Sequence, residues 1–284
     1  MNIEIICPLY NAEKYVLSLH RSLLNQQMVD IINIQYILTD SNDNTESIMN
    51  ENDIKYKKIS KDDFSHSLTR ETAALNSNAD IIVFISQDIV IEDNNWLFNL
   101  INPIIDDVAD ACYSRQLTKF NNIEKYTREA NYSSTSLIKT KDSIKELGLN
   151  TFFFSDAASA IKRDVFVELN GYDNKNLPIN EDMYLAYKII MHGYRIKYCA
   201  DSIIYHSHDF KLSELYDRYK LTGRFFKENN YLDQYGTTGS GAKLAKYILK
   251  RAIQEKNVKV LLRYPFDMTA RYIGMKVGKR KNEK

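Results

Sequence analysis

Three groups of side chains in this sequence have the chemistry of a metal site or of an acid–base catalyst. Asp88 follows the strongest strand signal in the chain, and the pair Glu181 and Asp182 opens a helical pattern. His206 and His208 are two residues apart, so an extended strand would place both on one face. Carboxylate oxygens suit Mg²⁺ or Mn²⁺, an imidazole commonly joins them, and a carboxylate can also take a proton from a hydroxyl. Asp88 and His206 are therefore candidate metal ligands, and Asp182 is a candidate general base.

Each of these signals also has an ordinary structural explanation. An Asp after a buried strand often caps the next helix, and carboxylates at a helix N-terminus are favoured by the helix dipole alone. His66 and Arg70 are four residues apart, so they could offer donors to a phosphate or sugar, or could lie on a solvated helix surface. We expect the aromatic stripe 152–154 and the single tryptophan, Trp96, to pack in the core.

Alternating strand and helix patterns place the candidates at one edge of a sheet. Three apolar runs predict strands at residues 3–7, 34–38 and 81–85, and a further strand is expected at 56–59. Helical patterns separate them, and the unbroken apolarity of 81–85 predicts a strand buried on both faces, as in a parallel sheet. Polar clusters follow three of these strands, at 8–11, 39–45 and 86–88. Ligands bind at the carboxyl ends of such strands, so these clusters predict the binding edge of a doubly wound α/β sheet.

The second half of the chain is less regular. A polar stretch at 121–149 predicts helices and loops over the site, and a helix is expected from Asn180 to Met191. The runs 195–199 and 202–205 predict two short strands, the latter ending at the histidines. Beyond residue 210 the pattern is helical.

Composition limits the class of protein. Its 284 residues are 44% apolar and 26% charged, as in an ordered globular protein, and Cys7, Cys112 and Cys199 lack the spacing of a zinc site or disulfide framework. With neither a signal peptide nor a membrane-spanning run, we expect a cytoplasmic protein.

The net charge of +1 conceals an uneven distribution. Residues 243–284 hold 13 Lys or Arg and 3 Asp or Glu, a net charge of +10, whereas residues 1–242 carry −9. The basic tail predicts either a helix packed on the body with a solvated basic face or peripheral attachment to the anionic inner face of the cell membrane. A nucleic-acid partner is not expected, because no nucleic-acid motif accompanies the charge.

The order and spacing of these segments resemble family 2 glycosyltransferases of the GT-A fold, most closely bacterial rhamnosyltransferases. Over roughly residues 1–210 the matching segments are CPLYN, TDSNDNT, FSHSLTRE, ISQDI, SDAASAIKRDVFVELNGYD, NEDMYLAYKI and YHSH. The segment of the form F-x-H-x-x-T-R at 64–70 and the segment Ser-Gln-Asp at 86–88 resemble the rhamnosyl branch of this family. A dinucleotide or nucleotidyl-transfer enzyme is disfavoured, because PLYNAEKY holds no glycine where such enzymes need a glycine-rich turn.

The resemblance implies roles for individual residues. Donor or nucleotide contacts are expected at Pro8, Tyr10, Asn11, Asp40, His66, Arg70 and Gln87. Asp88 ends a DxD-type motif and, with His206, is expected to hold Mg²⁺ or Mn²⁺. Asp156 is expected to contact the acceptor or donor sugar, and Asp182, beside Glu181, to be the base. Ser86 replaces the first Asp of the motif, so metal affinity is expected to be weaker.

The implied reaction is an inverting transfer in which Asp182 deprotonates an acceptor hydroxyl and the metal neutralises the leaving diphosphate. The expected donor is dTDP-L-rhamnose and the expected acceptor is a lipid-linked precursor of a cell-surface polysaccharide. A UDP-hexose donor and a catalytically inactive glycan-binding relative are the alternatives. The expected architecture is a mostly parallel GT-A sheet in residues 1–210, with a nucleotide-sugar half (about 1–110) and an acceptor half (111–210), followed by a basic helical extension (211–284).

Overall fold

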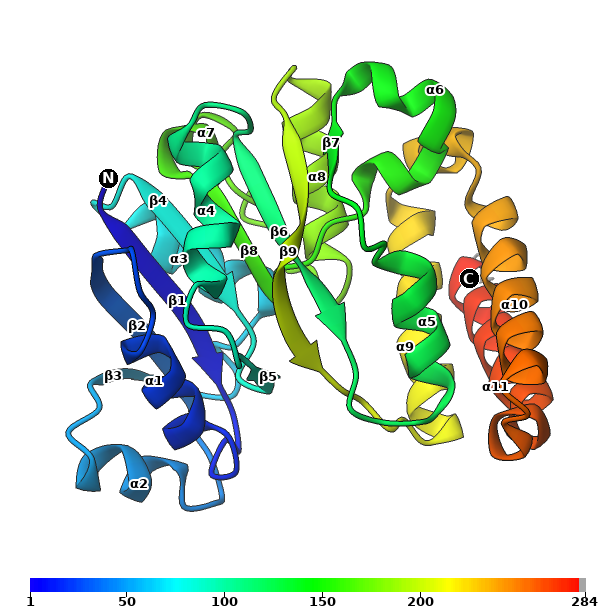
Figure 1. The fold of residues 1–284 in the computed structure, drawn as a ribbon, viewed down its shortest axis with the longest axis horizontal. Coiled ribbons are helices and arrows are strands. Elements are labelled where there is room, and N and C mark those ends of the chain that lie inside the picture. Colours follow the sequence, from blue (N-terminus) through cyan, green and yellow to red (C-terminus); the bar gives the residue numbers. More distant parts are fainter. Residues whose placement is uncertain (281–284) are drawn as a thin grey trace.

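The computed structural model describes residues 1–280, apart from the side chains of residues 237–240. Its described part forms one nine-stranded sheet with helices on both faces (Figure 1). The strands are β1 (Ile3–Leu9), β2 (Ile31–Thr39), β3 (Tyr56–Ile59), β4 (Ile81–Ile85), β5 (Ile89–Val90), β6 (Ala111–Leu117), β7 (Leu137–Lys139), β8 (Ala158–Lys162) and β9 (Ile196–His206). The helices are α1 (Val16–Leu24), α2 (Thr45–Glu51), α3 (His66–Leu75), α4 (Trp96–Ile105), α5 (Ile123–Asn131), α6 (Ile144–Leu147), α7 (Arg163–Glu168), α8 (Glu181–Met191), α9 (Leu212–Glu228), α10 (Thr237–Gln254) and α11 (Val258–Lys279).

The sheet is doubly wound and mostly parallel, as the sequence predicts. Its order is β3-β2-β1-β4-β8-β6-β9-β5, and β7 pairs with β9. Strands β3, β2, β1 and β4 run parallel, β8 is antiparallel to both of its neighbours β4 and β6, and β9 returns parallel to β6. The carboxyl ends of β1, β2 and β4 therefore lie at one edge, where the polar clusters follow.

Strand β4 shows why its sequence is apolar without interruption. Ile82 and Phe84 belong to the hydrophobic cluster that includes side chains of α3, α7 and α8. Ile81, Val83 and Ile85 belong to the cluster that includes side chains of α1 and α4. All five side chains are fully buried, because helices cover both faces of the sheet.

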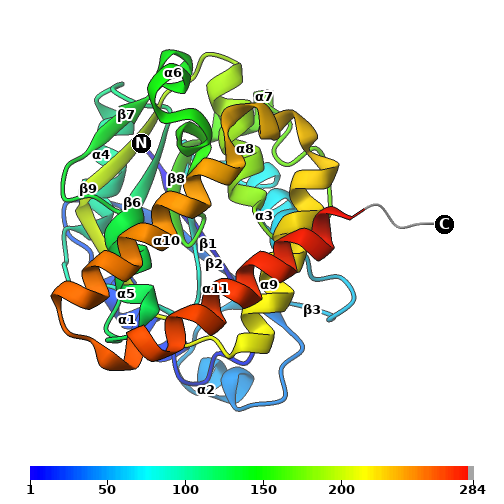
Figure 2. The ribbon, with the colours of Figure 1, turned by 90° about the vertical axis from the view of Figure 1, so that its right-hand side faces the viewer.

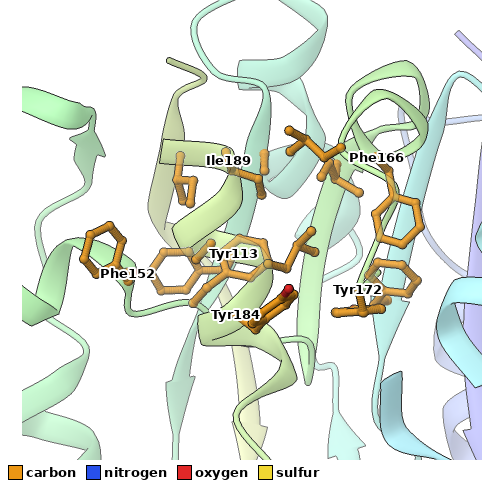
Figure 3. Packing of buried hydrophobic residues seen from close by; sticks show 14 of the residues in the cluster. Tyr113, Phe152, Phe166, Tyr172, Tyr184 and Ile189 are labelled. Carbon is orange, nitrogen blue, oxygen red and sulfur yellow. The ribbon is translucent and has the colours of Figure 1, made fainter. Parts of the chain in front are cut away.

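The aromatic residues mostly pack in this core. Phe152 and Phe154 are buried, and Figure 3 shows Phe152, Tyr113 and Tyr184 in the cluster on the α8 side of the sheet. Trp96 is fully buried, and its indole N–H donates to the Ser114 hydroxyl at 3.0 Å. The expectation that Trp96 and the stripe 152–154 serve packing is therefore confirmed, with Phe153 only partly buried.

One strand differs from the prediction of two short ones. β9 is continuous from Ile196 to His206, because its pairing with β6 jumps from Cys199 opposite Ser114 to Ile203 opposite Arg115. The polar residues that indicated a break form an irregularity within one strand. The stretch 121–149 holds α5 and α6, as expected, and also the short strand β7, which the sequence pattern did not indicate.

The C-terminal helices pack on the body. α11 runs along α9 and α10 lies against α5 (Figure 2). Gly223, Gly274 and Gly278 allow the backbones of α9 and α11 to touch, since a Cβ on Gly278 would lie 2.0 Å from the Lys220 carbonyl oxygen. Among the described residues, no helix has the length and apolarity needed to cross a membrane.

Candidate functional site

The loops that follow β1 and β2 are tied together at the sheet edge. Asn11 has a left-handed backbone (φ 49°), and its N–H donates to the Ser41 hydroxyl at 3.0 Å. Its side-chain oxygen accepts from the Asn42 N–H at 3.0 Å. Asp40 follows β2 with an exposed carboxylate 3.7 Å from Lys58 Nζ. The structure thus brings these predicted nucleotide contacts to one edge.

Gln87 joins the ends of β1 and β4. Its amide oxygen accepts from the Tyr10 N–H at 2.7 Å, and its amide nitrogen donates to the Tyr10 carbonyl at 2.9 Å. Tyr10 as a whole is 41% exposed, and Lys61 Nζ lies 5.4 Å from its ring centroid. Pro8 precedes this junction as the second-last residue of β1. Gln87 therefore orients the backbone that presents Tyr10.

Asp88, His206 and His208 form a cluster with the geometry of a metal site. His206 Nε2 lies 3.3 Å from Asp88 Oδ1, and His208 Nδ1 lies 3.8 Å from Asp88 Oδ2. One ligand atom from each residue can be chosen so that all lie within 4.8 Å of one another. Burial and the neighbouring His206 lower the pKa of His208 to about 3, so its imidazole is neutral and free to bind a cation.

Gln116 orients His206 from β6. The Gln116 side-chain oxygen lies 3.0 Å from His206 Nδ1 and also accepts from Arg128, so it must be the acceptor in both contacts. His206 therefore donates through Nδ1, and in a neutral imidazole its Nε2 is an acceptor facing the Asp88 carboxylate. The His206 Nε2 and the Asp88 carboxylate are then two acceptors close together, which fits a cation bound between them. A hydrogen bond from the other ring nitrogen, as from His206 Nδ1 to Gln116, is typical of histidines that bind a metal.

Glu181 and Asp182 begin α8, which starts after Asn180 in the left-handed conformation (φ 57°). The Asp182 carboxylate accepts from the Met183 N–H at 2.7 Å. Burial, together with the charges of Glu181 and Asp156, raises the pKa of Asp182 well above its usual range. Such a carboxylate holds a proton more tightly than a free Asp, as a general base requires.

Arg70 and Asp156 are buried more deeply in the protein than Glu181. The Arg70 guanidinium is 3.5 Å from Glu181 Oε1 and also donates to the His66 carbonyl at 2.9 Å. Asp156 is buried and accepts from the Tyr172 hydroxyl at 2.6 Å and from Ser159 at 2.8 Å, so both of its oxygens are engaged. The His66 ring is exposed against Phe64, whereas Arg70 is buried, so the two side chains do not share one surface.

A cavity of about 220 Å³ connects the two chemical groups. Asp182 and His208 both line it, so the candidate base and a candidate metal ligand open on the same space. Its remaining walls come mainly from α5, α9 and α11, and include Arg128, Arg218 and Arg271.

Sequence reasoning missed part of this site. His208 was not expected to bind metal, although its two-residue spacing from His206 was the available signal. Gln116 and Arg128 lie far from the histidines in the sequence and form no motif with them. Only the pairing of β6 with β9 brings Gln116 beside His206.

Comparison with known proteins gives consistent sequence matches. Residues 4–169 match the family model described as Glycosyl transferase family 2. The chain is 32% identical over 289 residues to the O-antigen chain rhamnosyltransferase RfbN of Salmonella typhimurium, covering 98% of this chain and 90% of that protein. It is 32% identical over 253 residues to the O-antigen chain rhamnosyltransferase WbaN of Salmonella anatum, covering 86% of this chain and 79% of that protein.

Solved structures share the fold at low sequence identity. A mannosyltransferase from Pyrobaculum calidifontis, solved with GDP-Man and Mn²⁺, has a TM-score of 0.67 and 15% identity and covers 99% of this chain and 88% of its own. Residues 1–349 of S. aureus TarS, solved with UDP-GlcNAc, have a TM-score of 0.58 and 17% identity and cover 95% of this chain and 79% of their own. The predicted GT-A fold with a helical C-terminal region is confirmed.

Proposed function

The chain belongs to glycosyl transferase family 2, and on that premise we propose that it transfers L-rhamnose from dTDP-L-rhamnose, with inversion, to a hydroxyl of a cell-surface polysaccharide precursor. The choice of sugar and acceptor class is supported by the two Salmonella relatives, which are O-antigen chain rhamnosyltransferases and match most of this chain.

One structural observation carries the mechanism. Asp182 and His208 line the same cavity, so a carboxylate with a raised pKa and a metal-type cluster face one reaction space. Inverting transfer needs this combination, because the base must stand on the opposite side of the sugar from the leaving diphosphate.

The chain's own residues supply the remaining steps. The Asp182 carboxylate takes the proton of the acceptor hydroxyl. The hydroxyl oxygen of the acceptor attacks the anomeric carbon of the donor sugar, and the bond between that carbon and the diphosphate breaks. No covalent intermediate with the protein forms, and a donor of β configuration gives an α-linked product. Glu181 lies 3.5 Å from the Arg70 guanidinium, and its charge beside Asp182 raises the pKa of Asp182, which strengthens Asp182 as a base.

We assign the divalent cation to Asp88, His206 and His208. The His208 imidazole adds a ligand near Asp88, which compensates for Ser86 at the first position of the DxD-type motif. One carboxylate with imidazoles suits Mn²⁺ well and Mg²⁺ less, since Mg²⁺ prefers oxygen ligands. When bound, the cation would carry part of the charge of the leaving diphosphate.

The nucleotide is assigned to the edge formed by the loops after β1 and β2. The exposed Tyr10 ring offers a stacking face to the base, and Asp40 offers a carboxylate to its polar edge. Pro8 and Asn11 shape this edge through the backbone, and Gln87 fixes Tyr10. Both carboxylate oxygens of Asp156 accept hydrogen bonds, one from Tyr172 and one from Ser159. We therefore assign Asp156 the role of positioning these two residues and no direct contact with the sugar.

A donor screen tests the proposal. The full chain is incubated with Mn²⁺ or Mg²⁺ and, separately, dTDP-L-rhamnose, UDP-glucose, UDP-galactose and UDP-N-acetyl sugars, and release of nucleoside diphosphate is measured. We expect release from dTDP-L-rhamnose. Release only from a UDP-sugar would favour the hexosyltransferase alternative, and release from none in a folded protein would favour an inactive glycan-binding relative.

We further propose that α10 and α11 attach the protein to an anionic membrane surface, where a lipid-linked acceptor would reside. Exposed apolar residues recur along both helices at Leu249, Ile253, Val258, Leu262, Phe266, Tyr272 and Ile273. Exposed cations lie among them at Lys243, Lys246, Lys250, Lys256, Lys259, Lys276 and Arg280. The inner sides of both helices pack on the body, so this mixed surface is the side that remains for lipid (Figure 2).

A further inference from the structure

The charges that line the cavity do not balance. Arg271 pairs with Glu124 at 3.2 Å. Arg128 and Arg218 also line the cavity, yet neither has a carboxylate within ion-pair distance in the described part of the chain. Asp182 is the other acidic residue in this lining, and among the described residues no ion pair joins it to Arg128 or Arg218. The cavity therefore holds two guanidinium groups whose charge is not matched by the protein.

Aromatic rings hold both guanidinium groups in place. Arg128, from α5, lies over the Tyr132 ring at 5.8 Å and donates to the Gln116 amide oxygen. Its buried Nε has no hydrogen-bond partner. Arg218, from α9, lies 5.7 Å from the centroid of the Phe210 ring, which itself stacks on His208 at 4.8 Å. Among the described residues, two helices thus bring guanidinium groups without an ion-pair partner to the part of the cavity next to the metal-type cluster.

Guanidinium groups of this kind are matched by phosphate oxygens, which accept two parallel hydrogen bonds from one guanidinium. Arg128 is partly buried, so leaving its charge without a counter-ion is unfavourable and an anionic ligand would remove that cost, whereas Arg218 is exposed and can reach the same ligand from the edge of the cavity. A neutral sugar hydroxyl would leave both charges unmatched. The two guanidinium groups therefore favour a phosphate or diphosphate group over an uncharged glycan.

We propose that Arg128 and Arg218 form a phosphate-binding site within the cavity lined by Asp182 and His208, with a phosphate or diphosphate group as its ligand. The inference rests on the proposed function, because that function supplies two possible sources of the phosphate group. It is either the diphosphate that leaves the donor or a phosphate on the acceptor, as expected where a glycan is joined to a lipid carrier through phosphate.

Arg218 is the residue best suited to a test. Its side chain makes no hydrogen bond or ion pair with the described residues, so R218Q removes the charge without removing a structural bond. Arg224 on the same helix is exposed and lies outside the cavity lining, so R224Q is the matched control. R128Q is the second variant, and its Mn²⁺ affinity is measured as well because Arg128 also bonds to Gln116.

Two titrations by calorimetry distinguish the sources. The first adds dTDP or UDP to the full chain with Mg²⁺. The second adds glucose 1-phosphate, with methyl glucoside as its uncharged counterpart, to protein already saturated with the nucleotide and Mg²⁺. If the ligand is the acceptor phosphate, glucose 1-phosphate binds and R218Q weakens that binding about tenfold or more, while the nucleotide affinity changes less than twofold. If the ligand is the donor diphosphate, R218Q weakens nucleotide binding by that factor instead.

Either result supports the site, provided that R224Q stays within twofold of the wild type. The inference is overturned if R218Q and R128Q, both folded by circular dichroism, bind both ligands within twofold of the wild type. Because the readout is binding and requires no turnover, a protein that releases nothing from dTDP-L-rhamnose can still pass or fail this test. Failure of the phosphate site and failure of the proposed reaction are therefore separate outcomes.

Discussion

Hydrogen bonding and burial set the chemical state of the two histidines in the metal-type cluster. Gln116 accepts from His206 Nδ1 at 3.0 Å and leaves Nε2 to face Asp88, while burial keeps His208 neutral. A cation needs ligand imidazoles that are free of their second proton, which His208 provides and which His206 provides at Nε2 in its neutral form. The site is thus organised by a glutamine that lies outside the cavity lining but hydrogen-bonds to two residues of it, Arg128 and Ser155.

The first prediction concerns these ligands. D88A, H206A and H208A should each weaken metal-dependent binding of dTDP by about tenfold or more, measured by calorimetry with and without chelator. Q116A, which removes the bond to His206 Nδ1 together with the bonds to Arg128 and Ser155, should cost about 10–100-fold in Mn²⁺ affinity. H192A, in an exposed histidine at the end of α8, is the control. Equal dTDP affinity with and without chelator in the wild type would end the assignment of a metal to this cluster.

The raised pKa of Asp182 predicts that the residue costs stability. Above its folded-state pKa the ionised carboxylate is buried beside Glu181 and Asp156, whereas in the unfolded chain it is solvated. D182N should therefore raise the Tm at pH 7–8, by about 2–4 °C for each kcal/mol gained. The gain should vanish below about pH 4, where Asp182 is protonated in both states.

Asp164 provides the matched control for this effect. It also stands in the first turn of a helix and accepts from the next N–H at 2.7 Å, but its side chain is exposed. D164N should give no gain and a slight loss, because it removes a favourable charge near the helix N-terminus. A Tm for D182N at or below that of the wild type throughout pH 4–8 would contradict the buried-charge explanation.

At the scale of helices and strands, periodicity predicts most of the frame of the site. The spans of β3 and β4 match the expected strands, and α8 begins with Glu181 as expected. Local patterns suffice there because hydrophobic spacing, the Ser65 cap and the helix-ending Gly193 act within a few residues. The irregularity in β9 and the contact of Gln116 with His206 depend on pairing between distant strands, which no local pattern encodes.

The crossing of α9 and α11 yields a prediction at this scale. A Cβ on Gly278 would lie 2.0 Å from the Lys220 carbonyl oxygen and 2.8 Å from the Arg224 backbone nitrogen. G278A should therefore force the helices apart and destabilise the protein by about 1–3 kcal/mol, measured by urea unfolding. G241A, in a helix position with nothing within 4 Å of the added Cβ, should be neutral or stabilising. Equal stability of G278A and wild type would show that this close contact is not maintained.

At the scale of the whole molecule, the C-terminal helices connect the cavity to the proposed membrane surface. Arg271 of α11 lines the cavity, while Leu262 and Phe266 of the same helix are exposed. The helical extension therefore both closes the acceptor side and offers a surface to lipid. The sequence left packing and membrane attachment as alternatives, and the structure shows that packing leaves the basic, apolar outer side exposed. The boundary at residue 210 stays a prediction.

The membrane proposal predicts salt-sensitive binding to anionic vesicles and weak binding to neutral ones. The variant K246Q/K250Q should bind anionic vesicles roughly 10–30-fold more weakly in co-sedimentation, at on the order of 1 kcal/mol per lysine. L262S/F266S should also bind more weakly, through lost insertion. The control K55Q/K57Q makes the same charge change at exposed lysines near β3, on the opposite side of the molecule (Figure 1). If K55Q/K57Q and K246Q/K250Q bind equally, or if the wild type does not bind, the surface has no membrane role.

The most direct measurement compares sugar transfer with donor binding in the wild type and D182N. An amide keeps the shape of the side chain and can still accept from the Met183 N–H, but it cannot take the proton of the acceptor hydroxyl. We predict that transfer from dTDP-L-rhamnose falls by about 10²–10⁴-fold in D182N, the usual contribution of a general base. The donor Kd should stay within about twofold of the wild-type value. Transfer by folded D182N at the wild-type rate would contradict the account, because the proton would then leave by another route.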